Sequence, residues 1–238
     1  MFEVSLLLVV IVATALIFDF TNGAHDCANA IASVVSTKVL TPRAAVTMAA
    51  ILNLVGALLG TEVAHTLGSG IVRTDVVMGS HVLVLAGLVG AIGWNSLTWY
   101  FGIPSSSSHA LIGGLMGAAL AHAGTGALNG MSIVTKVVVP LLLSPSAGFA
   151  VGFVLMTFIS IVFFHVNRPT VNRIFRRLQL VSAGTMALSH GLNDAQKTMG
   201  VITLALLIFG EIDTIAVPFW VKLACALAMA AGTGVCGW

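Results

Sequence analysis

The chain has 238 residues, of which 58% are hydrophobic and only 8% charged, with a net charge of +2 and a mean hydropathy of +1.07. Soluble domains have about 25% charged residues, so lipid must cover much of this apolar surface. The net charge is not that of a nucleic-acid-binding protein, and the long, unalternating apolar runs exclude a transmembrane β-barrel. The composition predicts an all-α polytopic membrane protein in the lipid bilayer.

Apolar runs predict membrane spans along most of the chain, at 4–36, 44–66, 81–101, 105–123, 145–164, 180–209 and 216–236. The N-terminal residues have no basic region and no cleavage site, so the first run is a retained span and not a signal peptide. Residues 126–143 are intermediate in character and are expected to form a surface helix or half of a re-entrant pair.

The basic residues set the predicted orientation. Residues 165–178 contain four arginines and no acid, which marks this stretch as a cytoplasmic loop. Counting spans from it places Lys38 and Arg43 inside, as the same rule requires, and the N-terminus outside. The span at 4–36 and the span at 180–209 therefore cross the membrane in opposite directions.

The first span has a polar stripe along one face. At 100° per residue, an arc of about 80° holds Asp19, Asn22, Asp26, Asn29 and Ser33. A carboxylate at the middle of a span costs about 2.5–3.5 kcal/mol on insertion scales and marks a functional candidate. Asp26 is such a candidate, and Asp19 could lie nearer to a water-filled vestibule. Alone, Asn22 could equally be a helix–helix contact.

The span at 180–209 has a second polar arc of about 100°, formed by His190, Asn193, Asp194 and Lys197. Asp194 and Lys197 could be an internal ion pair; alternatively, Lys197 meets an anionic substrate while Asp194 helps to hold a cation.

Aligning Gly23 with Gly191 also aligns Asp26 with Asp194 and Asn29 with Lys197. Two related segments in opposite orientation predict inverted-topology repeats with a site near the membrane midplane. The two glycines either break their helices to present backbone groups to ions, or allow close packing.

A serine-rich segment, Ser105, Ser106, Ser107 and Ser108, precedes an apolar helix. Hydroxyls and free backbone N–H groups at a helix N-terminus form an anion site without any fixed positive charge, whereas ordinary N-capping needs only one serine.

Together these stretches resemble the inorganic phosphate transporter family, the low-affinity phosphate permeases. The similar segments are Asn22-Gly-Ala-His-Asp-Cys-Ala-Asn-Ala30, Ser189-His-Gly-Leu-Asn-Asp-Ala-Gln-Lys197 and Trp99-Tyr-Phe-Gly-Ile-Pro-Ser-Ser-Ser-Ser-His109. The resemblance implies a secondary symporter of the cell membrane that carries inorganic phosphate with H⁺ or Na⁺, without a cofactor. It also implies inverted repeats with re-entrant hairpins, so 105–123 could be part of a hairpin, which 126–143 would then complete.

The resemblance also assigns roles to residues. Phosphate binding is expected at Asn29, Ser105, Ser106, Ser107, Ser108, Asn193 and Lys197. The coupling proton or cation is expected at Asp26, Asp194, Asn22 and Asp19. Free phosphate and a metal–phosphate complex remain open as the substrate form, and a homodimer remains open as the assembly.

The expected organisation is a first repeat over 1–164, a basic loop at 165–178 and an incomplete second repeat over 179–238. The serine segment of the second repeat would fall beyond Trp238, so we expect a truncated product or one part of a split transporter.

Three other functions fit less well. Another oxyanion such as sulfate is the main alternative substrate, since helix N-termini discriminate weakly among tetrahedral anions. An intramembrane aspartyl protease could pair Asp26 with Asp194, but it leaves the serines and asparagines without a role. A passive channel lacks a visible filter.

Overall fold

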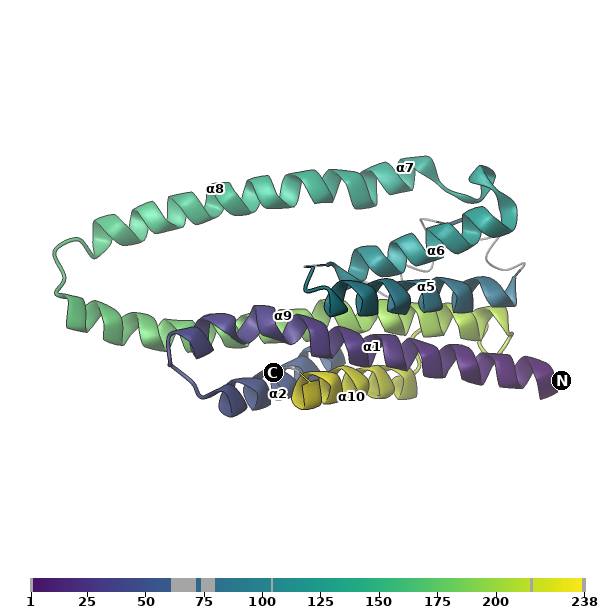
Figure 1. Ribbon diagram of the computed structural model, residues 1–238, viewed down its shortest axis with the longest axis horizontal. Coiled ribbons are helices and arrows are strands. Elements are labelled where there is room, and N and C mark those ends of the chain that lie inside the picture. Colours follow the sequence, from purple (N-terminus) through teal and green to yellow (C-terminus); the bar gives the residue numbers. More distant parts are fainter. Residues whose placement is uncertain (1, 61–71, 74–79, 104, 215, 237–238) are drawn as a thin grey trace.

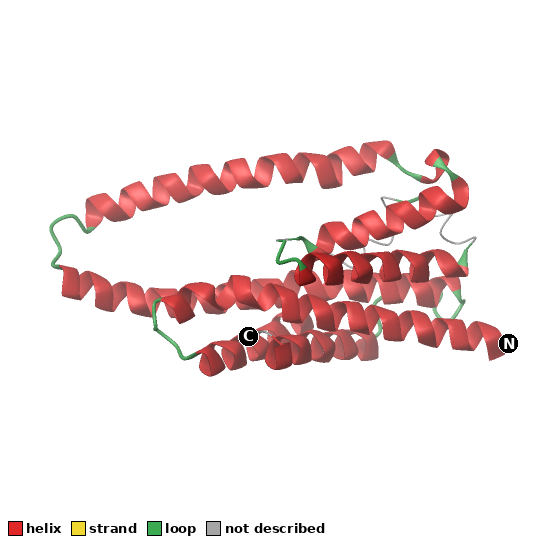
Figure 2. Cartoon of the chain, in the orientation of Figure 1, coloured by secondary structure: helices red, strands yellow, loops and turns green. Residues whose placement is uncertain are grey.

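The computed structural model describes residues 2–60, 72–73, 80–103, 105–214 and 216–236, and within them the chain is built of helices joined by short loops (Figures 1 and 2). The principal helices are α1 (Phe2–Ser36), α2 (Pro42–Leu59), α5 (His81–Tyr100), α6 (Ser107–Ala123), α7 (Gly130–Ile133), α8 (Val139–Val162), α9 (Arg168–Ile208) and α10 (Phe219–Cys236). Among the described residues, four helical stretches are long and apolar enough to cross a membrane, which confirms the all-α polytopic class.

Helices α1 and α9 run antiparallel through the centre of the bundle (Figure 1). Helix α10 packs mainly on α1, helix α2 packs mainly on α9, and α5 packs on α6. The main apolar core lies where these helices meet and includes the fully buried Phe18, Leu88, Leu111, Met199 and Met229. In lipid, such side chains stabilise the arrangement by close van der Waals packing between helices rather than by removal from water.

Glycines set the closest helix crossings. A Cβ on Gly23 would collide with the backbone of Met229, and a Cβ on Gly232 with the backbone of Phe20, so α1 and α10 meet at backbone contact. The same relation joins α9 and α2, where Gly191 faces Asn53 and Gly56 faces Leu188.

These crossings have matching spacing. In both, each glycine meets the residue that lies three positions before the glycine of the partner helix. The expected helix breaks at Gly23 and Gly191 are wrong, because α1 and α9 continue as helix through both positions. Small residues are used here for close approach.

Helices α5 and α6 form an antiparallel hairpin (Figure 1). Its turn contains Gly102, whose positive φ of 65° suits glycine, and Ser106 caps α6 by accepting a hydrogen bond from the His109 N–H. The start of α6 contacts α1 at Asp26, which lies about 15 Å of helix before the end of α1 at Ser36. The hairpin is therefore complete with 81–100, and the expectation that 126–143 completes it is wrong; Pro104 lies outside the described residues.

Residues 130–162 form one long helical stretch that joins α7 and α8 through a π-helical segment, Val134–Val138. The separate element expected at 126–143 is thus mostly the first part of a span. Pro140 lies inside this continuous helix, directly after its π-helical segment, so its missing N–H removes one hydrogen bond of the helix there. This stretch stands apart from the rest of the bundle in Figure 1.

The basic segment is helical rather than a loop. Helix α9 begins at Arg168, capped by the Asn167 side chain, which accepts a hydrogen bond from the Thr170 N–H at 3.2 Å. The connection between α8 and α9 is therefore only 163–167, and the predicted 165–178 loop is wrong in conformation. The arginine-containing segment is the first part of α9, before its apolar region.

Candidate functional site

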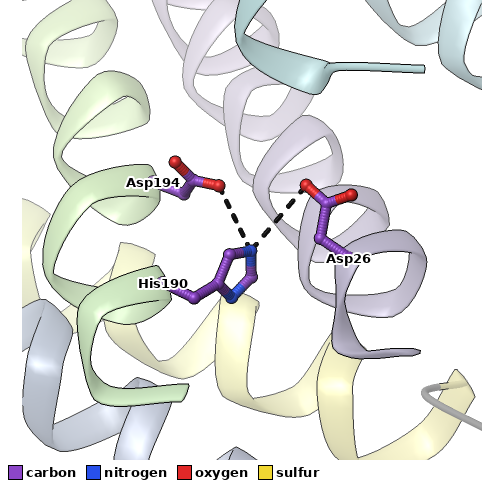
Figure 3. Close-up of side chains that lie close together, drawn as sticks. All are labelled: Asp26, His190 and Asp194. Carbon is purple, nitrogen blue, oxygen red and sulfur yellow. Dashed lines mark ion pairs between the residues drawn. The ribbon is translucent and has the colours of Figure 1, made fainter. Parts of the chain in front are cut away.

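The centre of the site lies between α1 and α9. The His190 ring sits between two carboxylates, with its Nε2 3.2 Å from Asp194 Oδ2 and 3.8 Å from Asp26 Oδ2 (Figure 3). One ligand atom from each of the three side chains falls within 4.8 Å of the others, a spacing that could hold a cation. The polar arcs predicted on two distant spans are thus brought face to face.

A buried hydrogen-bond chain fixes the orientation of His190. The Asn53 amide donates to Thr233 Oγ1 at 2.8 Å, and Thr233 donates to the Gly23 carbonyl at 3.0 Å. Because the Asn53 amide nitrogen is used in this way, its oxygen is the atom that faces His190 Nδ1 at 3.2 Å, and Nδ1 carries the hydrogen. Nε2 therefore faces the carboxylates, and a second ring hydrogen on this atom is placed for donation to Asp194 Oδ2 at 3.2 Å.

The tip of the α5–α6 hairpin closes onto this cluster. Ser107 is buried and donates a hydrogen bond to Asp26 Oδ2 at 3.1 Å. Lys197 donates to both Ser108 Oγ and Asp194 Oδ1, so it joins the hairpin to α9. His25 Nδ1 lies 3.1 Å from Asp26 Oδ1.

A second pair of polar side chains is buried deeper on α1. Asp19 is fully buried and accepts a hydrogen bond from Thr198 Oγ1 at 3.0 Å through Oδ1. Asp19 Oδ2 and Asn22 Oδ1 have no hydrogen-bond partner among the described residues. An unsatisfied buried acceptor costs about 1–3 kcal/mol, so the two unpaired oxygens destabilise the folded state. Asp19 does not line the cleft described next, in contrast to the vestibule position considered for it.

An open cleft of about 700 Å³ leads to the carboxylate cluster. Its walls are Asp26, Asn29, Ala30, Ser182, Thr185, Met186, Ser189, His190, Asn193 and Asp194. Asn29 and Asn193 are exposed in this cleft, and the Asn193 amide donates to the Ser189 carbonyl at 2.9 Å. Most of the lining residues are polar, and the two carboxylates in the lining are contacted from the α5–α6 hairpin side by Ser107 and Lys197, which suits a small, hydrated ion.

The structure brings most of the predicted residues together, and it adds others. Ser107 bonds Asp26, Lys197 bonds both Ser108 and Asp194, and His190 lies between the two carboxylates. Ser106 is exposed and serves as the helix cap, while Ser105 is half-buried. Sequence reasoning missed Asn53 and Thr233, which are isolated polar residues in apolar surroundings, and Thr198, which directly follows Lys197. Only their burial between helices reveals them.

Comparison with known proteins agrees with the geometry. The model of the phosphate transporter family matches residues 22–170 and 164–238. A probable low-affinity inorganic phosphate transporter of Bacillus subtilis is 48% identical over 98% of this chain and 70% of its own length. One of Mycobacterium tuberculosis is also 48% identical, and the chain spans 56% of that relative.

A solved structure described as "The sodium-dependent phosphate transporter" superposes with a TM-score of 0.87. The match covers 97% of this chain and 76% of that one at 22% sequence identity, and it shows the shared fold. With these matches, the chain belongs to the phosphate transporter family.

Proposed function

We propose that this chain carries inorganic phosphate across the membrane as a symporter, with H⁺ or Na⁺ as the coupling ion. One observation supports this most directly: the serine-rich hairpin tip is bonded to both carboxylates of the central cluster, through Ser107 on Asp26 and through Lys197 between Ser108 and Asp194. The hydrogen-bond donors suited to an anion are therefore bonded to the carboxylates suited to a cation.

Charge explains how such sharing couples two ions. Phosphate carries one to two negative charges near neutral pH, so ionised Asp26 and Asp194 repel it. A proton or cation on these carboxylates removes the repulsion and also releases Ser107 and Lys197 from their present partners. The anion then binds well only when the coupling ion is present.

The roles follow from position. Serine hydroxyls, the N-terminus of α6, Lys197 and the cleft asparagines offer hydrogen-bond donors, which suit phosphate oxygens. The proposed phosphate ligands are Asn29, Ser105, Ser106, Ser107, Ser108, Asn193 and Lys197. The carboxylates Asp26 and Asp194, with His190 between them, hold the coupling ion.

The test is phosphate uptake by the purified chain in proteoliposomes, with imposed H⁺ and Na⁺ gradients applied separately. Asp26→Asn and Asp194→Asn each abolish gradient-driven uptake. A neutral amide lacks the negative charge that binds the coupling ion, so the ion is neither bound nor released at that position. Glu211→Gln, an exposed acid outside the site, serves as the matched control and keeps wild-type uptake. Near-normal coupled uptake by both site variants contradicts the proposal.

Competition in the same vesicles decides the substrate. Excess unlabelled phosphate suppresses uptake of labelled phosphate, whereas equal sulfate has little effect. Equal suppression by sulfate would make the chain a general oxyanion carrier. Adding or chelating Mg²⁺ separates free phosphate from a metal–phosphate complex.

A further inference from the structure

A single missing hydrogen accounts for two unsatisfied atoms in the core of α1. Within the described part of the chain, Asp19 Oδ2 and Asn22 Oδ1 are buried acceptors without partners, and their residues lie one helical turn apart, where side chains are neighbours. Neither oxygen has a hydrogen, so an ionised Asp19 leaves both unsatisfied. A proton on Asp19 Oδ2 turns it into a donor that Asn22 Oδ1 can accept.

The surroundings favour this neutral form. The ionised carboxylate would have one hydrogen-bond donor, Thr198, and it is fully buried beside the apolar core that includes Ala15, Phe18 and Cys225. An isolated buried carboxylate takes up a proton rather than stay charged. The groups on α9 that interact electrostatically with Asp19 are Asp194, His190 and Lys197. On α10, the Cys225 thiol interacts with Asp19 in the same way.

We propose that Asp19 and Asn22 form an occluded proton-binding site, in which the Asp19 carboxyl is protonated and donates to Asn22. It is distinct from the Asp26–His190–Asp194 cluster, because that cluster lines the cleft and neither Asp19 nor Asn22 does. Thr198 joins it to α9, four residues after Asp194, so a change at the cluster reaches Asp19 through one helical turn. If the proposed function holds, the proton on Asp19 is transported together with phosphate.

Infrared spectroscopy of the purified protein in lipid tests the site without any transport. A buried, protonated carboxyl gives a C=O stretch above the amide region that ionised carboxylates lack. We expect this band in the wild type at neutral pH, its loss in Asp19→Asn, and its retention in Asp26→Asn and Asp194→Asn. Asn22→Leu keeps the band but shifts it to higher frequency, because the acceptor is gone.

Several results would overturn the inference: no band in the wild type, a band that survives in Asp19→Asn, or a band that disappears on addition of Na⁺. The last result assigns the two oxygens to a metal ion. Thermal unfolding of Asp19→Asn checks its fold, and Asn22→Leu supplies the independent reading. If the wild type has the band but does not transport phosphate, the proposed function fails and the proton site stands.

Discussion

Among single residues, Lys197 has two competing uses. It contacts Asp194 on its own helix and Ser108 on the hairpin, and both partners are candidates for ion binding. As a structural residue it would only neutralise Asp194. As a ligand it would leave Asp194 once the coupling ion arrives and turn toward phosphate. The two uses predict different effects on affinity.

Lys197→Ala should weaken phosphate binding at least about tenfold, because charge-assisted hydrogen bonds contribute about 1.5–3 kcal/mol and 1.4 kcal/mol is a factor of ten. Equilibrium binding of labelled phosphate to the purified protein measures this. The exposed Lys136 provides the matched control, Lys136→Ala, which removes the same charge without touching the cluster. Unchanged affinity in Lys197→Ala would assign this lysine to the structural ion pair.

The central residues of the site were predictable, since 100° geometry and the cost of a buried charge single out Asp26 and Asp194 from sequence alone. Their partners were not. Asn53 and Thr233 lie on different helices, and neither belongs to a polar stripe. Their value arises only because α2 and α10 place them within 2.8 Å of each other, a tertiary fact that local periodicity does not encode.

At the level of helices, glycine and proline were the ambiguous signals. A glycine in a polar motif fits a broken helix and a close crossing equally well, since both need the absent side chain. The structure assigns Gly23 and Gly191 to crossings. Pro140 lies inside the continuous 130–162 helix, beside its π-helical segment, and does not end it.

Gly23→Ala should destabilise the protein by about 1–3 kcal/mol or more, because the added methyl meets backbone atoms of α10 that cannot move aside independently. Gly117→Ala, in α6, is the matched control: its methyl meets no atom within 4 Å, and it should be neutral or slightly stabilising. Thermal unfolding in one detergent compares the two. Equal midpoints for both variants would contradict the assigned crossing.

For the whole molecule, the two basic stretches that the charge pattern assigned to one side of the membrane lie at the same end of the bundle. Arg176 donates to the Lys38 carbonyl at 3.0 Å, so the two basic stretches lie at one end. The His81 and Phe209 rings lie 4.6 Å apart at the other end. The sequence could predict this arrangement because basic residues flank the spans. The position of α8 could not be predicted, since its apolar surface carries no mark of which helix it meets.

Cysteine labelling tests the orientation in intact cells. With the native cysteines replaced, an impermeant maleimide should label Asp213→Cys from outside and spare Asn167→Cys until the membrane is permeabilised. Both positions are exposed, so accessibility within the protein does not bias the comparison. The reverse pattern would invert the assigned topology and place the N-terminus in the cytoplasm.

The paired glycine crossings also bear on mechanics. Helices locked at backbone contact can neither slide nor turn independently, so we expect α1 with α10, and α2 with α9, to move as two stiff units. These units then meet at the α1–α9 seam, which contains Asp26, His190 and Asp194, and at the contact of α2 with α10 through Asn53 and Thr233. An ion bound at Asp26 and Asp194 would therefore sit at the junction itself, so its binding energy would directly change how the two helix pairs are positioned relative to each other.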